Sequence, residues 1–213
     1  MPAYDRKDHF HQRAKREGFR SRAAYKLLEI QQSQRLLRPG QRVIELGCWP
    51  GGWLQVAAQA VGPAGRVVGV DLAAIDPPLD DENVFALLGD FTQPTVVKQL
   101  IELLGGRAEV LLCDAAPKLT GIRDTDHARE GALLEAVEAI LGQLLAPGGT
   151  LLTKILDGPD ATDVDRRLRK RFESAKTVKP KASRRGSSER YLLGRGYKDP
   201  SKLTPQPVQK ENP

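Results

Sequence analysis

The chain has 213 residues, 40% of them hydrophobic, and a formal net charge of +6. This length and composition predict one folded domain with a buried core and argue against a disordered chain. No apolar run has the length of a membrane span and the polar N-terminus lacks a signal-peptide core, so we expect a cytoplasmic protein without membrane contact. The two cysteines, Cys48 and Cys113, are expected to be reduced packing residues, and the lack of a Cys/His cluster predicts no metal site.

The N-terminal residues are polar and basic. Residues 1–38 carry ten Lys or Arg against four Asp or Glu, a net charge of +6. Apolar residues recur with helical spacing within residues 22–34, which predicts a helix that is capped by Ser21 and carries Lys26. We interpret residues 1–38 as a basic RNA-binding segment whose helix packs on the following domain.

A glycine-rich turn follows the first expected strand. Residues 43–46 are typical of a strand and residues 54–61 of a helix, with Gly47, Gly51 and Gly52 in the turn between them. The turn lacks the last glycine of the dinucleotide fingerprint and the lysine of a P-loop. Its spacing is that of an S-adenosylmethionine (SAM) loop, although an ordinary strand-to-helix turn explains it equally well.

An acidic residue ends the next expected strand, residues 66–71. Asp71 lies about 20 residues after the glycines, where a carboxylate can bind the two hydroxyls of a ribose. This second observation favours a nucleoside-binding site over an ordinary turn.

Strands and helices alternate through the rest of the chain. The pattern predicts strands at residues 84–88, 109–114, 150–155, 176–178 and 190–193, and helices that end at residue 104 and span residues 128–145 and 163–172. Thr92 or Thr95 is expected to cap the first of these helices, and Pro147-Gly148-Gly149 to end the second. Such alternation is typical of a parallel α/β sheet. We expect one domain at residues 39–196 and a disordered tail at residues 197–213.

Five residues of chemical interest fall at the carboxyl ends of the expected strands, where parallel sheets bind ligands: Gly47, Asp71, Asp90, Asp114 and Lys154. Lys154 is costly to bury alone, and Asp114 is a natural partner if the two strands are neighbours. The pair is explained either by a structural salt bridge or by a lysine whose pKa is adjusted for proton transfer. Lys26 is a candidate for a second cation that would favour neutral Lys154.

The charge distribution suggests a polyanionic partner. Residues 39–165 carry a net charge of −11, whereas residues 166–198 carry +11. An acidic middle flanked by basic segments suits a domain that holds a small cofactor and binds a polyanion such as a nucleic acid with its ends, the alternative being solvated surface cations. The candidate RNA-binding residues are Arg13, Lys15, Arg16, Arg20, Arg22, Arg184 and Arg185.

Four residues in their local contexts resemble those of a known family. Lys26, Asp114, Lys154 and Glu189 resemble the Lys-Asp-Lys-Glu tetrad of the RrmJ/FtsJ family of SAM-dependent RNA 2′-O-ribose methyltransferases. The likeness runs from Asp8 to Gly194 and includes Pro50-Gly51-Gly52-Trp53, Gly89-Asp90-Phe91 and Leu145-Ala146-Pro147-Gly148-Gly149. The resemblance implies a Rossmann-like α/β fold whose central, mostly parallel seven-stranded sheet is flanked by helices.

The resemblance also implies roles for these residues. It makes Lys26, Asp114, Lys154 and Glu189 the catalytic residues, with Lys154 accepting the proton of the ribose 2′-hydroxyl or orienting that hydroxyl. It places the SAM cofactor at Gly47, Pro50, Gly51, Gly52, Trp53, Asp71, Leu72, Asp90, Phe91 and Asp114. The chain departs from the family at Cys48-Trp49, where two small residues are expected; Trp49 either narrows the pocket or packs outward.

The function implied by the resemblance is methylation of the A-loop uridine of 23S rRNA, in the large ribosomal subunit, by a monomeric enzyme. The same chemistry on a tRNA ribose is an alternative within this class. A non-catalytic RNA-binding assembly factor on the same fold is an alternative outside it. A small-molecule methyltransferase is disfavoured by the two basic flanks of the chain.

Overall fold

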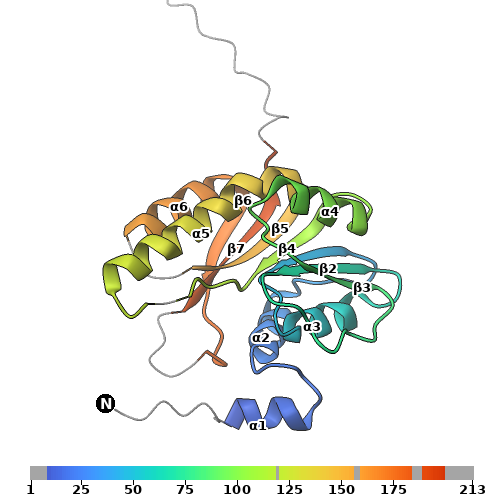
Figure 1. Cartoon of the computed structure of the whole chain (residues 1–213). Helices are drawn as coiled ribbons and strands as arrows, with labels where there is room; N and C mark the ends of the chain where they lie inside the picture. The colour runs from blue at the N-terminus through green and yellow to red at the C-terminus, as the bar shows by residue number, and fades with distance from the viewer. Residues whose placement is uncertain (1–8, 119, 156–158, 184–188, 200–213) are drawn as a thin grey trace, which may run out of the picture.

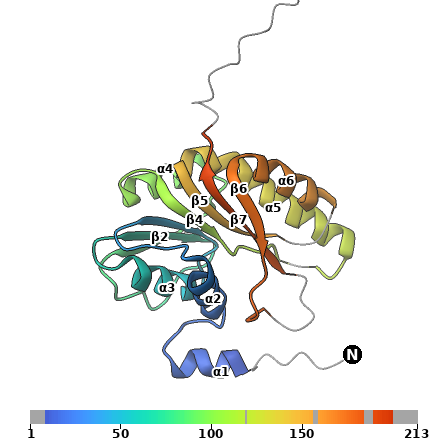
Figure 2. The same cartoon turned by 180° about the vertical axis from the view of Figure 1, so that it is seen from behind.

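A computed structural model describes residues 9–118, 120–155, 159–183 and 189–199 of the chain. Within them, a seven-stranded sheet carries helices on both faces (Figures 1 and 2). The strands are β1 (Arg42–Leu46), β2 (Arg66–Asp71), β3 (Val84–Leu88), β4 (Ala108–Cys113), β5 (Leu145–Ile155), β6 (Phe172–Val178) and β7 (Arg190–Tyr197). Their order is β3-β2-β1-β4-β5-β7-β6, with β7 antiparallel to both of its neighbours and the other pairs parallel. The expected mostly parallel, Rossmann-like sheet is confirmed.

The helices form a layer on each face of the sheet. One layer contains α2 (Ala24–Gln34) and α3 (Gly52–Val61), and the other contains α4 (Pro94–Leu104), α5 (Arg123–Leu144) and α6 (Pro159–Lys170). Helix α1 (His9–Arg16) lies beyond α2, away from the sheet (Figure 1). In the part of the chain that the structure describes, no helix combines the length and the apolar character needed to cross a membrane.

The apolar character of β1 explains why both faces of the sheet are covered. Val43 packs in the core on the α2 and α3 side, whereas Ile44 and Leu46 pack in the core on the opposite side, and all three are fully buried. Because successive side chains of a strand point to opposite faces, a continuous apolar run needs a layer on each face. Burial of each such side chain contributes about 1.5–3 kcal/mol, and this packing fixes the strand ends at which the site lies.

The start of α2 differs from the expected one. The helix begins at Ala24, with Ala23 at its N-cap and no side-chain cap, so the expected cap at Ser21 is wrong. The residues before the helix form a turn in which the Ala24 amide donates to the Ser21 carbonyl. The Ser21 side chain instead packs so tightly against Gly52 that no Cβ would fit there.

The expected threonine cap of α4 is also wrong. Thr92 is engaged elsewhere, because its amide and its hydroxyl both donate to Asp90 Oδ1, at 2.9 and 2.7 Å. Gln93 therefore occupies the N-cap with an extended backbone, and Pro94 supplies a φ angle that favours the first helical turn. Thr95 lies inside the helix.

Other elements are longer than the sequence pattern predicts. Helix α1 was not expected in the polar, basic N-terminal segment, and α5 and α6 begin before residues 128 and 163. Strand β5 begins at Leu145. Pro147-Gly148-Gly149 therefore lies within β5, next to an irregularity in its pairing with β4, and does not separate the strand from the helix.

The C-terminal strands extend furthest beyond the expected bounds. Strand β6 begins at Phe172 and β7 continues to Tyr197, and the rings of these two residues lie 5.6 Å apart. Asp199 is also buried, and its carboxylate pairs with Arg107 at 2.9 Å. The expected disorder is therefore wrong for residues 197–199, while residues 200–213 lie outside the described part. The division of the chain into three parts stays a prediction.

Candidate active site

The sheet brings the candidate site residues to one edge. Because the chain connections diverge on either side of β1 and β4, the carboxyl ends of these neighbouring strands form a switch point, where open α/β sheets bind ligands. Gly47 follows β1 with a φ of +79°, and a Cβ at this position would lie 2.6 Å from the Cα of Ala115. Glycine thus allows the loops after β1 and β4 to approach closely.

A cavity of about 390 Å³ opens at this edge. Six of the expected cofactor residues line it: Gly47, Asp71, Leu72, Asp90, Phe91 and Asp114. Its volume is in the range of small-molecule sites, and its carboxylates and apolar side chains suit an adenosine group. A larger hollow of about 1140 Å³ lies at the opposite edge of the sheet, and none of the candidate catalytic residues lines it.

Two carboxylates of the cavity are held by neighbouring donors. Asp71, at the end of β2, accepts hydrogen bonds from the amides of Trp49 and Ala73, both at 2.9 Å. Asp90 accepts from the amide and the hydroxyl of Thr92, and these hydrogen bonds lower the pKa of its carboxyl. Asp90 is therefore held as an anion, and Asp71 is fixed in orientation at the cavity wall.

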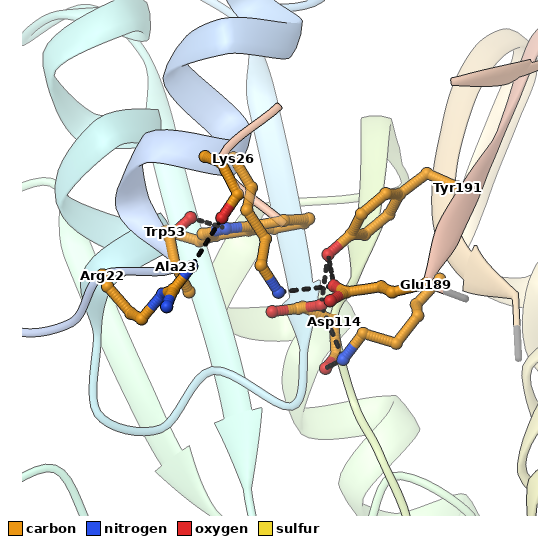
Figure 3. Close-up of polar contacts among 9 residues, drawn as sticks. Arg22, Ala23, Lys26, Trp53, Asp114, Glu189 and Tyr191 are labelled. Carbon is orange, nitrogen blue, oxygen red and sulfur yellow. Dashed lines mark hydrogen bonds and ion pairs between the residues drawn. The ribbon is translucent and has the colours of Figure 1, made fainter. Parts of the chain in front are cut away.

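The remaining expected cofactor residues do not line the cavity. The buried Trp53 indole donates from Nε1 to the Ala23 carbonyl at 2.8 Å and lies 5.7 Å from the Tyr191 ring, so it joins α3 to α2 (Figure 3). The residues without a place on the cavity wall are Pro50, Gly51, Gly52 and Trp53. Their role at the cofactor stays a prediction.

The four expected catalytic residues come together as two ion pairs, and Figure 3 labels three of them, Lys26, Asp114 and Glu189. Lys154 of β5 donates to Asp114 Oδ1 at 2.8 Å and to the Asp114 backbone carbonyl at 2.7 Å. Lys26 of α2 pairs with Glu189, which immediately precedes β7. The four side chains are only 10–14% exposed. Segments distant in the chain thus form one charged cluster, which borders the cavity through Asp114.

Tyr191 links the two ion pairs. Its hydroxyl lies 2.7 Å from Asp114 Oδ1 and 2.5 Å from Glu189 Oε1. The hydroxyl has a single proton to donate, so the two carboxylates share it as hydrogen-bond acceptors. Burial, followed by the charges of these carboxylates, raises the pKa of Tyr191 well above its usual value. Tyr191 was not among the residues expected at the site. The sequence feature that could have identified Tyr191 is its spacing from Glu189, because residues 189 and 191 lie on the same side of an extended segment.

The cluster holds Lys154 as an ammonium group. Burial acts to lower its pKa, but the charge of Asp114 and the hydrogen bond to it outweigh burial and raise the pKa above the ordinary lysine value. The expectation that Lys26 favours neutral Lys154 is wrong, because Glu189 pairs with the Lys26 charge. Burial likewise acts to raise the pKa of Glu189, but the Lys26 ammonium leaves it below its ordinary value.

Glu45 is a buried acid near the site that was not among the expected site residues. It lies in β1, is 2% exposed, and its Oε2 has no hydrogen-bond partner among the described residues. Burial, followed by the charges of Asp114 and Asp71, raises its pKa well above the ordinary glutamate value. A single acid in an otherwise apolar strand was the available signal. Across the described ranges, no group of three or more His, Cys, Asp or Glu is placed to hold a metal ion.

The expected RNA-binding residues divide into two groups. Arg13, Arg20 and Arg22 donate hydrogen bonds to a carboxylate or to backbone carbonyls of this chain. Lys15 and Arg16 are exposed on α1. Arg184 and Arg185 lie outside the described residues. The RNA-binding role of the whole set stays a prediction, and Lys15 and Arg16 are best placed to test it.

Residues 19–197 match the family model of FtsJ-like methyltransferases. The chain belongs to the FtsJ-like methyltransferase family. The matched span contains the whole sheet and all four residues of the charged cluster. The expected fold, methyltransferase class and SAM cofactor are therefore confirmed at the level of this family.

Curated relatives agree with membership of the FtsJ-like family. The chain is 46% identical over 197 residues to the ribosomal RNA large subunit methyltransferase E of Methanothermobacter thermautotrophicus, which spans 92% of this chain and 93% of the relative. It is 44% identical over 191 residues to the protein of the same name from Alkalilimnicola ehrlichii, which spans 89% and 90%. The names of both relatives describe methyltransferases of large-subunit ribosomal RNA.

Solved structures agree with the same assignment. A ribosomal RNA methyltransferase from Plasmodium falciparum has a TM-score of 0.73 at 27% identity, covering 84% of this chain and 99% of that one. Fibrillarin from Aeropyrum pernix, solved with bound SAM, has a TM-score of 0.56 at 18% identity, covering 82% and 74%. The fibrillarin likeness supports the fold alone.

Proposed function

We propose that this FtsJ-like chain transfers a methyl group from SAM to a ribose 2′-hydroxyl of ribosomal RNA. The observation that carries the proposal is the charged cluster at the cavity. Asp114 belongs to both, because it lines the cavity and pairs with Lys154. A hydroxyl that reaches Lys154 therefore lies next to a site for the methyl donor.

The residues of the cluster suit the charges of this reaction. During transfer the hydroxyl oxygen bonds to the methyl carbon, the carbon–sulfur bond breaks, and the hydroxyl proton is released. Positioning the two reacting groups in line supplies several kcal/mol of the barrier reduction. The carboxylates of Asp71, Asp90 and Asp114 favour a ligand that carries positive charge.

Lys154 has two possible tasks, which depend on its protonation state. As an ammonium group it uses two hydrogen bonds on Asp114, and its third N–H can donate to the 2′-oxygen. As a neutral amine it can accept the hydroxyl proton. The raised pKa supports the ammonium as the state of the free protein. A cation bound beside Asp114 would lower the pKa of Lys154 and favour the second task.

We further propose the A-loop uridine of 23S rRNA, within the large ribosomal subunit, as the target. Support comes from the names of the relatives, which specify the large subunit, and from the basic segments that flank the acidic middle of the chain. Action in the cytoplasm and a monomeric state are parts of the same proposal that rest on the sequence resemblance.

The test is methylation of defined RNA pools with labelled SAM. Large ribosomal subunits and tRNA are prepared from cells that lack this protein, and the labelled nucleotide is mapped. We expect one labelled 2′-O-methyluridine in the A-loop. Labelling of tRNA would show that tRNA is the target in place of 23S rRNA, and it would leave the proposed 2′-O-methylation chemistry unchanged. Binding of RNA without any methyl transfer would contradict the enzymatic proposal.

A further inference from the structure

Exposed apolar side chains gather at the mouth of the cofactor cavity. The large apolar side chains that are exposed in the described structure are Trp49, Leu72, Leu88 and Ile122. Trp49 is 58% exposed and Leu72 is 77% exposed, and both line the same cavity, after the neighbouring strands β1 and β2. Apolar surface collected at one cavity marks a contact for a ligand. The proposed function gives Trp49 no task.

We propose that the indole of Trp49 lies against the adenosine part of the bound methyl donor and covers the cavity. This inference rests on the proposed function, because it requires SAM in this cavity. The chain has Cys48-Trp49 where small residues are expected in the family. Under this inference, the consequence of that departure is tighter binding of the cofactor.

The backbone of Trp49 places its side chain beside the expected ribose site. The Trp49 amide donates to Asp71 Oδ2 at 2.9 Å, so the residue that carries the indole also orients the carboxylate expected to bind the ribose. The preceding Cys48 is 2% exposed and packs so closely against Gly69 that no Cβ would fit there. Cys48 therefore fills the core, and Trp49 is left at the cavity.

The charge of the cavity favours the cofactor over RNA as the partner of Trp49. An indole can stack on any nucleobase, so the aromatic ring alone does not choose between them. The wall also carries the carboxylates of Asp71, Asp90 and Asp114. These charges repel the phosphates of RNA and attract the sulfonium and ammonium groups of SAM. The indole therefore fits a nucleoside that brings positive charge.

Fluorescence quenching tests the contact directly. The chain has two tryptophans, and Trp53 is only 2% exposed, so acrylamide quenches chiefly Trp49. Saturation with S-adenosylhomocysteine, which cannot react, should lower the quenching constant by about half, because a seated ligand buries most of its own surface against the protein. RNA alone should leave the constant unchanged.

Calorimetry with matched variants tests the energetic consequence. Trp49→Ala should weaken S-adenosylhomocysteine binding by about 5- to 100-fold, the range expected for removing an aromatic ring that stacks on a base. Trp49→Phe should retain most of the affinity. Leu88→Ala is the control, because Leu88 is 67% exposed but lies outside the cavity wall. Thermal melting establishes that each variant is folded.

The outcomes separate this inference from the proposed function. Wild-type affinity of Trp49→Ala, together with unchanged quenching, would overturn the contact and leave the proposed function intact. Quenching that responds to RNA but not to S-adenosylhomocysteine would assign Trp49 to the RNA surface and overturn the contact as well. Failure of the wild-type protein to bind S-adenosylhomocysteine would overturn both.

Discussion

Lys154 contacts Asp114 twice, at the carboxylate oxygen Oδ1 and at the backbone carbonyl, at 2.8 and 2.7 Å. The double contact fixes the ammonium group at the end of β4, where the cavity opens. The ammonium group, which lies at the end of a long flexible side chain, is thus held in one position, as required of a group that contacts the reacting oxygen.

Lys154→Ala should therefore reduce single-turnover methylation by about 10²-fold or more, the range for loss of a general base or a positioning group. SAM and RNA affinity should stay near wild type, because an interaction made in the transition state affects rate rather than ground-state binding. Lys154→Arg should not restore the rate, since the arginine guanidinium keeps its proton and is planar and larger than an ammonium group. A folded Lys154→Ala protein that methylates at the normal rate would remove Lys154 from the catalytic residues.

The pKa of Lys154 can be measured by NMR of a protein labelled at the lysine ε-carbons. The structure predicts a value above that of an ordinary lysine, because the Asp114 charge outweighs burial. In Asp114→Asn the burial remains and the charge is lost, so the pKa should fall below the ordinary value of about 10.4. A wild-type pKa already below that value would show that burial prevails and that a larger fraction of Lys154 is the neutral amine that can accept the hydroxyl proton.

Asp71 should contribute directly to SAM affinity. Asp71→Ala should weaken SAM binding by about 1–3 kcal/mol through the lost ribose hydrogen bonds, and it also frees the amides of Trp49 and Ala73. Asp80→Ala, which removes an exposed acid outside the cavity, serves as the control. Equal SAM affinities of the two variants in calorimetry would remove Asp71 from the cofactor site.

The exposed cations of α1 should carry part of the RNA affinity. Replacing Lys15 and Arg16 by alanine should weaken RNA binding and reduce its salt slope by up to about two, on the order of one per lost phosphate contact. These side chains are exposed, so SAM affinity and melting temperature should be unchanged. Lys98→Ala with Arg66→Ala removes two exposed cations of α4 and β2, both within the acidic middle of the chain, and is the matched control. An equal loss in both double variants would indicate a general charge effect rather than a binding surface.

Glu45 should make stability depend on pH. Its folded-state pKa is raised by burial, so the unfolded chain ionises first and stability falls as the pH rises above the ordinary value of about 4.3, by about 1.4 kcal/mol per pH unit until the raised pKa is reached. Glu45→Gln should therefore stabilise the protein near neutral pH more than at about pH 4. Urea unfolding at both pH values measures the difference, with exposed Glu82→Gln as the control. An equal effect of Glu45→Gln at both pH values would mean that the folded-state pKa of Glu45 is not raised.

The sequence predicted the sheet and the Asp114–Lys154 pair well because both depend on strong local patterns, whereas Glu189 was expected in the cluster only from the family resemblance. Apolar runs ending in polar residues located Asp71, Asp114 and Lys154 at strand ends, where the structure has them near one cavity. The pairing partners were harder to predict. Only the fold shows that Lys26 faces Glu189 rather than Lys154, since the two residues are 163 positions apart in the chain.

Specific side-chain contacts account for two of the errors. Thr92 could not cap α4 because Asp90, two residues earlier, binds both of its donors. Tyr197 was assigned to a disordered tail because the aromatic ring that it packs against, Phe172, belongs to another strand. Such contacts form between segments that sequence periodicity treats as independent.

Helix α2 near the start of the chain and strand β7 near its end both contribute to the charged cluster, and this has a consequence for biosynthesis. Domains gain structure from their N-terminal part first as the chain is made. A nascent chain that stops before residue 189 has Lys26 and Asp114 but neither Glu189 nor Tyr191, so both hydrogen bonds of the Tyr191 hydroxyl are missing. Under the proposed function, the charged cluster around the reacting hydroxyl is therefore complete only after β7 has been made and has paired with β5.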